Sequence, residues 1–182
     1  MSAEYPLLDC PVLGFAAFSG TGKTTLIKQL IPLLHDKGIN IGVIKHTHHD
    51  IEPDQPGKDS YELRHAGAQQ TILAGSKRWS LITETTEQTE PVLSDILQQF
   101  DQQKLDLILV EGFRDEAIPK IELHRSILDK PFIFSNDKNI IAIACDDPNS
   151  IKATIKTTLP ILDINNPADI AEFIMLNILS ND

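Results

Sequence analysis

Short apolar runs and stretches of helical periodicity alternate along the first quarter of the chain. Residues 11–18 (PVLGFAAF) form a continuous apolar run that ends in a glycine-rich turn, which is typical of a buried strand. From residue 24 to residue 36, leucines and isoleucines recur at helical spacing, so we expect a helix that Pro32 kinks and Gly38 ends. Residues 39–45 (INIGVIK) predict a second strand. Strand, loop, helix and strand in this order make a βαβ unit.

A polar stretch comes next, and strands then alternate with helices to the end of the chain. Residues 46–59 (HTHHDIEPDQPGKD) contain two prolines and a glycine and predict a loop. Ser60 is expected to cap a short helix that ends at Gly67. We expect further strands at residues 70–74, 78–85, 105–110, 120–123 and 140–144, and further helices at 91–100 and from 168 to about 179, after a turn at 161–167.

The alternation of strands and helices favours an α/β fold with a mostly parallel sheet and helices on both faces. A length of 182 residues suits one α/β domain, and 41% apolar residues are enough for a core. We therefore predict that residues 1–182 form a single domain.

Composition and charge exclude several classes of partner. The chain carries 16 basic and 26 acidic residues, a net charge of −10, which repels nucleic-acid phosphates. Cys10 and Cys145 lie far apart and suggest no disulfide framework, so a reducing cytoplasm is expected. The N-terminal segment lacks the pattern of a signal peptide, and no run of about 18 apolar residues could cross a bilayer. We expect a soluble cytoplasmic protein that binds neither nucleic acid nor membrane.

The turn between the first strand and the first helix reads AFSGTGKTT, residues 17–25. It matches the phosphate-binding pattern G-x-x-x-x-G-K-[ST] except at its first position, where the chain has Ala17. Only a positive φ strictly requires glycine, so alanine is expected to be tolerated there if φ is negative. Because the motif follows an apolar strand and precedes an apolar helix, it predicts a nucleotide site rather than a chance glycine-rich turn.

Each type of residue in this loop is expected to contribute differently to binding a nucleotide. Glycines let the backbone curl so that its N–H groups point inward at phosphate oxygens, next to the positive end of the helix. Lys23 is expected to reach the β- and γ-phosphates as a catalytic cation, and the Thr24 hydroxyl to bind Mg²⁺. The residues of the loop that we expect to contact the nucleotide are Ser19, Gly20, Thr21, Gly22, Lys23, Thr24 and Thr25.

A second acidic element lies in LILVEGF, residues 107–113. An apolar strand that ends in an acid is typical of a Walker B segment, so Glu111 is expected to hold Mg²⁺ or to orient the attacking water as a catalytic residue. The alternative is an acid that only ends a strand, and the nearby phosphate loop favours the metal role. Asp106, at the other end of the same run, is the weaker candidate.

The histidine-rich segment KHTHHD, residues 45–50, follows the second predicted strand. His46 and His48 would face the same side of an extended chain. Three interpretations stay open: contact with the nucleotide or Mg²⁺, a plain solvated loop, or a Zn²⁺ or Ni²⁺ site. In the first, Lys45 is a phosphate or carboxylate partner and Asp50 a second acid near Mg²⁺.

Two arginines have two interpretations each. Arg64 on the short helix and Arg114, three residues after Glu111, could supply positive charge to the phosphates, or could be solvated surface residues. Trp79 and Phe113 are expected to serve packing or an interface rather than base stacking.

Taken together, these segments resemble the MobB family of adapter proteins of molybdopterin-guanine dinucleotide biosynthesis. The resemblance is dense over residues 12–74 and 105–114. The block KHTHHD followed by GKDSYELR is more specific than the phosphate loop alone, and alanine at position 17 is compatible with the family. The segments that carry it are FAAFSGTGKTTLIKQLIPLL, GVIKHTHHD, PGKDSYELRHAGAQQTI, LDLILVEGF and ILDIN.

The resemblance implies a P-loop NTPase fold of the class that includes dethiobiotin synthetase. It also implies a cytoplasmic homodimer that binds GTP with Mg²⁺ and hydrolyses it weakly. Its partners would be the molybdenum cofactor guanylyltransferase, which attaches GMP to molybdopterin, and, as a second partner, the molybdenum insertase. By position, residues 20–25 would hold phosphates, Thr24 and Glu111 would hold Mg²⁺, and residues 46–50 and 59–64 would line the site.

The choice of base and two other functions stay open at this point. The guanine-reading pattern N-K-x-D is absent, and residues 136–138 (NDK) have its residues in the wrong order, so guanine rests on the resemblance alone. A metal-insertion GTPase of the nickel type would need metal binding by the histidine segment. A small-molecule kinase or ligase would need an acceptor pocket. No catalytic glutamine or arginine finger is evident, which favours slow turnover.

Overall fold

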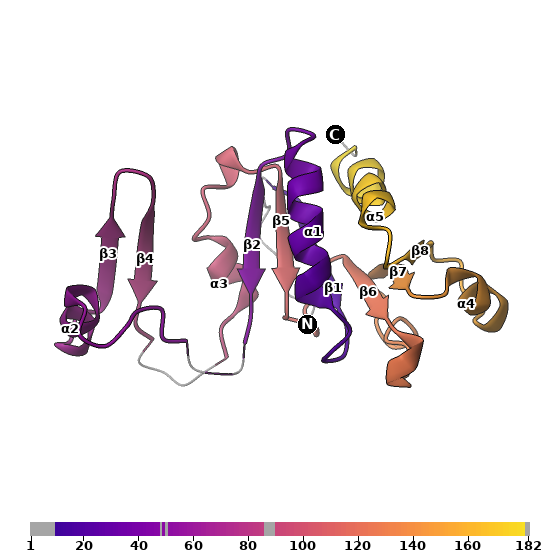
Figure 1. The fold of residues 1–182 in the computed structure, drawn as a ribbon, viewed down its shortest axis with the longest axis horizontal. Helices are drawn as coiled ribbons and strands as arrows, with labels where there is room; N and C mark the ends of the chain where they lie inside the picture. The colour runs from indigo at the N-terminus through magenta and orange to yellow at the C-terminus, as the bar shows by residue number, and fades with distance from the viewer. Residues whose placement is uncertain (1–9, 48, 50, 86–89, 181–182) are drawn as a thin grey trace. The chain divides into compact units, whose positions relative to one another are not determined.

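The computed structural model describes residues 10–47, 49, 51–85 and 90–180 (Figure 1). They form two compact units. The α/β unit contains the residues up to 46 and those from 92 onward, and the hairpin unit contains residues 47–91. The interpretation of residues 1–182 as one nucleotide-binding domain stays a prediction.

The α/β unit is built on a six-stranded sheet with the order β2-β5-β1-β6-β7-β8. All its strand pairs are parallel, so the carboxyl ends of the strands meet at one edge. The α/β fold with a mostly parallel sheet is confirmed. The strands are β1 (Val12–Ala16), β2 (Ile41–Lys45), β5 (Leu107–Glu111), β6 (Lys120–His124), β7 (Ile140–Cys145) and β8 (Ile161–Asp163).

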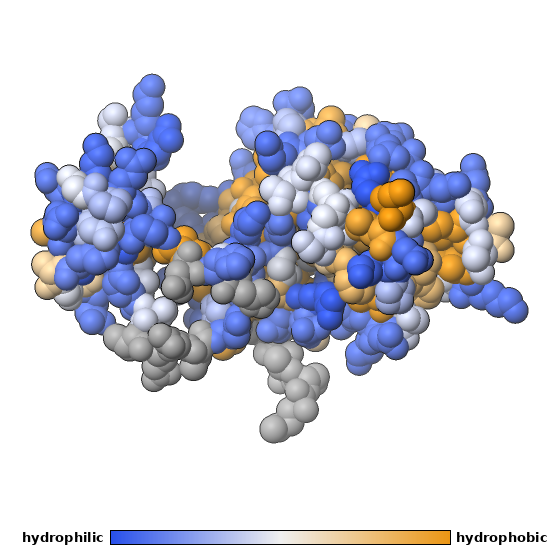
Figure 2. Space-filling model, turned by 60° about the horizontal axis from the view of Figure 1, so that its bottom comes forward, coloured by the Kyte–Doolittle hydropathy of each residue, from blue (hydrophilic) through white to orange (hydrophobic). Residues whose placement is uncertain are grey.

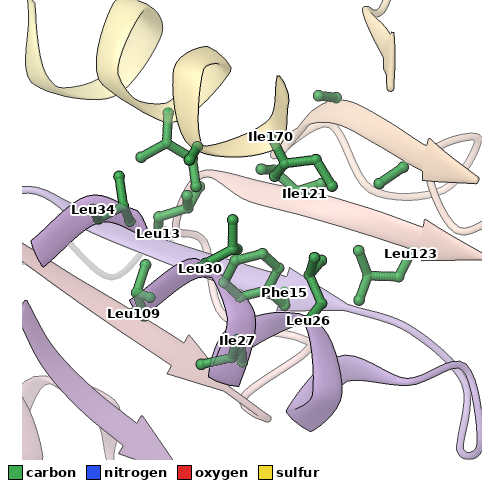
Figure 3. Packing of buried hydrophobic residues seen from close by; sticks show 14 of the residues in the cluster. Leu13, Phe15, Leu26, Ile27, Leu30, Leu34, Leu109, Ile121, Leu123 and Ile170 are labelled. Carbon is green, nitrogen blue, oxygen red and sulfur yellow. The ribbon is translucent and has the colours of Figure 1, made fainter. Parts of the chain in front are cut away.

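Helices cover both faces of this sheet, as predicted. Leu13 and Phe15 of β1 face α1 (Lys23–His35) and α5 (Pro167–Ile174), which continues as the π-helix η3 (Met175–Leu179) (Figure 3). Val12 and Ile108 point to the opposite face and pack with α3 (Leu93–Leu97). Since β1 and β5 are buried on both faces, they read as continuous apolar runs.

The helix predicted at residues 24–36 is confirmed as α1, with Pro32 inside it and Gly38, at a φ of +85°, shortly after its end. Other predicted boundaries are wrong for local reasons. The helix predicted at 91–100 shortens to α3. The segment predicted as a turn at 161–167 contains β8, whose three residues pair with the end of β7. Three further elements were not predicted: α4 (Pro148–Thr154) and the 3₁₀ turns η1 (Gln102–Lys104) and η2 (Ser126–Leu128).

The hairpin unit contains α2 (Asp59–His65) and an antiparallel pair, β3 (Gln70–Ala74) and β4 (Trp79–Thr83). Ser60 does not cap α2: the N-cap is Lys58, and the Ser60 hydroxyl donates to Asp54 instead. Large apolar side chains on the hairpin stay exposed, with Ile72 at 63% and Trp79 at 68%.

On the face drawn in Figure 2, apolar residues are interspersed with hydrophilic ones and form no continuous stripe. No helix in the described part of the chain is both long and apolar enough to cross a membrane.

Candidate functional site

The phosphate loop connects β1 to α1 at the carboxyl edge of the sheet. Gly20 and Gly22 have φ values of +81° and +100°, which explains why glycine stands at both positions. Among the described non-glycine residues, only Phe113 and Asp129 have a positive φ, so Ala17 has a negative φ and meets the condition under which alanine is tolerated. Alanine therefore fits the first position of the loop without backbone strain.

The start of α1 presents an anion site. The first N–H groups of a helix have no partner within it, and they carry the positive end of the helix dipole. Gly22 at the N-cap offers no side-chain cap, and the first turn holds no acidic residue. The Lys23 ammonium folds back over the loop and donates to the carbonyls of Ala17 at 3.1 Å and Phe18 at 3.3 Å. This is the donor set that a polyphosphate chain requires.

The environment of Lys23 favours a bound anion. Partial burial lowers the pKa of its ammonium, Glu111 opposes this effect, and the cations of Lys45 and Arg114 lower the pKa further. The cation is therefore held at a cost in free energy that a phosphate would relieve.

Thr24 and Glu111 meet beside the loop. The Thr24 hydroxyl donates to Oε1 of Glu111 over 2.6 Å, and Nζ of Lys45 lies 3.3 Å from the Thr24 oxygen and 3.5 Å from Oε1. The register explains the meeting, because Glu111 stands opposite both Phe15 and Lys45 in the sheet. Hydroxyl and carboxylate oxygens are the hard ligands that Mg²⁺ prefers, so these residues fit a magnesium ion.

His46 packs into the turn that follows Glu111. Its N–H donates to the Glu111 carbonyl over 2.8 Å, and its ring stacks on Phe113 with centroids 4.5 Å apart. A Cβ on Gly112 would lie 2.6 Å from the His46 Cβ, and Phe113 has a φ of +51°. The tight turn thus fixes both His46 and the acid before it, while contact of His46 with a nucleotide stays a prediction.

Sequence reasoning missed Arg125, the residue after β6. Its Nε donates to the Thr21 carbonyl over 3.0 Å, and Nη1 donates to Oδ1 of Asn165 over 3.3 Å. The C=O of Thr21 and the N–H of Gly22 belong to one planar trans peptide and point in opposite directions. By holding the carbonyl, Arg125 sets the direction of an N–H group in the phosphate loop. Its place at the end of a strand next to β1 was the available signal.

Other predicted residues have different places. The guanidinium of Arg64 lies in the hairpin unit, where it pairs with Glu52 and, at 2.7 Å, with Glu84, and its role at a phosphate stays a prediction. His48 and Asp50 fall outside the described residues. Arg114 does reach the phosphate loop, with its guanidinium 5.9 Å from the centre of the Phe18 ring.

No three histidine, cysteine, aspartate or glutamate side chains come together as a metal site within residues 10–47, 49, 51–85 and 90–180. A transition-metal role for the histidine segment therefore gains no support from its described part. What the site can do chemically is hold phosphates on backbone N–H groups and Lys23, with two oxygen ligands for Mg²⁺ beside them.

The chain is similar in sequence to bacterial adapter proteins. It is 50% identical to the molybdopterin-guanine dinucleotide biosynthesis adapter protein of Escherichia coli, over 91% of each chain. It is 46% identical to the adapter protein of the same description from Haemophilus influenzae, over 90% of this chain and 87% of that one.

The fold has matches among solved structures. The crystal structure of Bacillus subtilis MobB superposes with a TM-score of 0.70 at 24% identity, over 94% of this chain and 99% of that one. At this identity the likeness concerns the fold alone. The family model described as molybdopterin guanine dinucleotide synthesis protein B matches residues 12–146. With that match and the half-identical adapter from E. coli, the chain belongs to the MobB family.

Proposed function

We propose that this chain is a Mg²⁺-dependent GTP-binding adapter of molybdopterin-guanine dinucleotide biosynthesis, with weak GTPase activity. The observation that carries the proposal is the mutual contact of the Thr24, Glu111 and Lys45 side chains beside a phosphate loop. A phosphate loop alone supports only phosphate binding, whereas two oxygen ligands next to it support a nucleotide bound together with Mg²⁺. The choice of guanine rests on family membership.

Each residue has a defined part in this proposal. The N–H groups of residues 20–25 and the Lys23 ammonium bind and orient the phosphates, and Thr24 and Glu111 hold the metal. When bound, Mg²⁺ would neutralise charge on the β- and γ-phosphates. Glu111 would also orient an attacking water. Hydrolysis is expected to be slow because no glutamine or arginine in the sequence stands in a recognisable position to accelerate it.

The proposed partners follow from the family. The chain would act in the cytoplasm beside the guanylyltransferase that attaches GMP to molybdopterin, with the molybdenum insertase as a second partner. We also propose a homodimer. The exposed Ile72, Leu81 and Trp79 of the hairpin support an interface there, since apolar side chains gathered on a two-stranded hairpin are a usual mark of one.

Calorimetry with GTP and ATP, each with and without Mg²⁺, tests the proposal. We expect GTP to bind more tightly than ATP, Mg²⁺ to strengthen binding, and turnover well below about one per second. A pull-down of purified guanylyltransferase with and without GTP tests the partner. Equal affinity for the two nucleotides, or turnover far above that rate, would overturn the adapter function.

A further inference from the structure

Two connections of the α/β unit contain no α-helix. Residues 112–119 join β5 to β6, and residues 125–139 join β6 to β7 with only the short turn η2. Parallel strands are usually joined by helices that cover the sheet. Here these two loops and Phe18 of the phosphate loop line a cavity of about 740 Å³, within the range of small-molecule sites.

Two buried charged side chains anchor the loops that line this cavity. Lys120 and Glu122 of β6 are each 1% exposed and point to the face opposite α1, since they alternate with Ile121 and Leu123 of the α1 side. Charged groups are rarely buried unless every polar atom is satisfied. Both side chains meet this condition by binding the two loops.

The contacts of Lys120 and Glu122 fix the loops through their main chains. Nζ of Lys120 donates to the carbonyls of Arg114, at 2.9 Å, and Glu116, and pairs with Oδ2 of Asp137 at 2.8 Å, which uses all three of its protons. The Glu122 carboxylate accepts the N–H groups of residues 133 and 134 at 2.7 and 2.8 Å. One loop is therefore anchored by the lysine, and the other by both residues.

The glycine opposite Lys120 belongs to the same arrangement. Gly14 of β1 pairs with Lys120, and a Cβ at Gly14 would lie 2.7 Å from Cγ of Lys120 and 3.0 Å from Cδ1 of Ile118. The strand thus leaves room for the stem of a buried lysine where an apolar side chain would fill the core. Gly14 is therefore part of the arrangement that lets Lys120 reach the two loops.

The lining of the cavity combines aromatic rings with cations. Phe132 and Phe134 are in edge contact with centroids 5.6 Å apart, and Phe132 is fixed by stacking on His124 at 4.1 Å. Arg114 and Lys138 supply positive charge. The lining contains two acids. Asp137 forms an ion pair with Lys120. Asp115 is 95% exposed and lies 3.6 Å from Arg114, which makes a weak surface pair.

We propose that this cavity binds a planar heteroaromatic ring that carries an anionic group. The ring would stack among Phe18, Phe132 and Phe134, and the anionic group would contact Arg114 and Lys138. The site goes beyond the proposed function, because apart from Phe18 and Arg114, which lie at the phosphate loop, its lining is outside the residues assigned to GTP and Mg²⁺. Two sources share this chemistry, a nucleotide base with its phosphate and a pterin with an acidic substituent.

Amide NMR on the full chain tests the proposal. The ¹⁵N-labelled protein is titrated separately with GMP and with pterin-6-carboxylate, with and without Mg²⁺ and a non-hydrolysable GTP analogue. We expect at least one probe to give saturable shifts confined to residue 18 and residues 113–119 and 131–139, whether or not the analogue is present. The probe that gives them identifies the source. Titration with the analogue alone reports GTP binding separately, so failure of one proposal is distinguished from failure of the other.

Matched variants complete the test. Phe132→Leu and Lys138→Gln are each expected to weaken probe binding about tenfold, the loss of one ring or one charge contact. The controls Trp79→Leu and Lys104→Gln change residues that are not part of the cavity lining, and should leave probe binding unchanged. Lys120→Met should abolish probe binding while the GTP analogue still binds. The proposal is overturned by the absence of saturable shifts with both probes, by loss of binding when the analogue is present, or by unchanged affinity in both cavity variants.

Discussion

The hydroxyl of Thr24 and the carboxylate of Glu111, 87 residues apart in the chain, lie 2.6 Å apart in the fold. Thr24 lies in the first turn of α1 and Glu111 ends β5, and the parallel sheet brings both to the same edge. Replacing the carboxylate by an amide keeps the size of the side chain and removes a charged metal ligand. For Glu111→Gln we expect the gain in GTP affinity that Mg²⁺ provides to fall at least about tenfold, while Mg²⁺-free binding changes little.

Calorimetry at several Mg²⁺ concentrations measures this effect. Asp106→Asn is the control, because Asp106 lies just before β5 and binds Asn40 instead. An unaltered Mg²⁺ dependence in Glu111→Gln would show that the carboxylate is not a ligand.

Lys23→Ala tests the phosphate loop itself. The ammonium lies over the loop carbonyls, where a polyphosphate would replace these contacts with stronger charge-assisted hydrogen bonds. We expect GTP affinity to fall by at least about tenfold, measured by binding of a fluorescent GTP analogue. Lys28→Ala, on the exposed side of α1, removes an equal charge and should have little effect. Equal affinities in the two variants would contradict the assignment of the loop.

Arg125 is expected to act through the Thr21 carbonyl. Arg125→Ala frees this peptide to turn, so binding of both GTP and inorganic tripolyphosphate should weaken about tenfold, and Arg125→Lys should restore part of the loss. The two ligands are compared by calorimetry, because tripolyphosphate has no base and reports the phosphate loop alone. Arg78→Ala in the hairpin unit controls for the lost charge. Full affinity for tripolyphosphate in Arg125→Ala would exclude a positioning role.

Gly112→Ala separates backbone strain from steric conflict. The glycine has a φ of +99°, and its added Cβ would lie 2.6 Å from Cβ of His46. Gly38 has a φ of +85° with open space around it. Gly38→Ala therefore introduces backbone strain without a steric conflict, at a cost of about 1 kcal/mol in the free energy of unfolding. We expect Gly112→Ala to lower the free energy of unfolding by more than Gly38→Ala, measured by urea denaturation. It should also weaken Mg²⁺-dependent GTP binding, since the turn carries Glu111. Equal losses of stability would show that the turn can relax.

The pair of Lys120 and Asp137 predicts a pH dependence of stability. Burial raises the pKa of Asp137, but hydrogen bonds from Lys120 and Asn139 outweigh burial and bring it below its ordinary 3.8. The folded state then binds fewer protons than the unfolded state, so this stabilisation is present above about pH 3.8 and is lost as the pH falls through the lower folded pKa.

Asp137→Asn should therefore cost about 1–3 kcal/mol at pH 7, because it leaves the buried ammonium without its counter-charge. The difference from the wild type should shrink in acid. Urea denaturation between pH 3 and pH 7 measures it, with the exposed Asp115→Asn as control. A difference that stays constant over this range would show that the pKa of Asp137 is the same in the folded and unfolded states, and would contradict the stabilising pair.

Much of the fold could be predicted because local signals agreed with the tertiary structure. The apolar runs at β1 and β5 are continuous since both faces of these strands are buried. Weaker local signals failed. The three residues of β8 are too few for periodicity, and β8 exists because the end of β7 offers it a partner. Ser60 has the right type for a cap, but its hydroxyl binds Asp54.

The same distinction holds for the candidate site. The phosphate loop, its two glycines and Glu111 at the end of the neighbouring strand could be predicted, because they depend on the local order of strand, turn and helix. Three contacts could not be predicted and became visible in the fold: Arg125 holds the Thr21 carbonyl, Arg64 pairs with Glu52 and Glu84, and Lys120 and Glu122 anchor two loops around a cavity. These contacts join residues distant in the chain, and a hydrogen bond between such residues depends on the packing of whole elements, which no local pattern records.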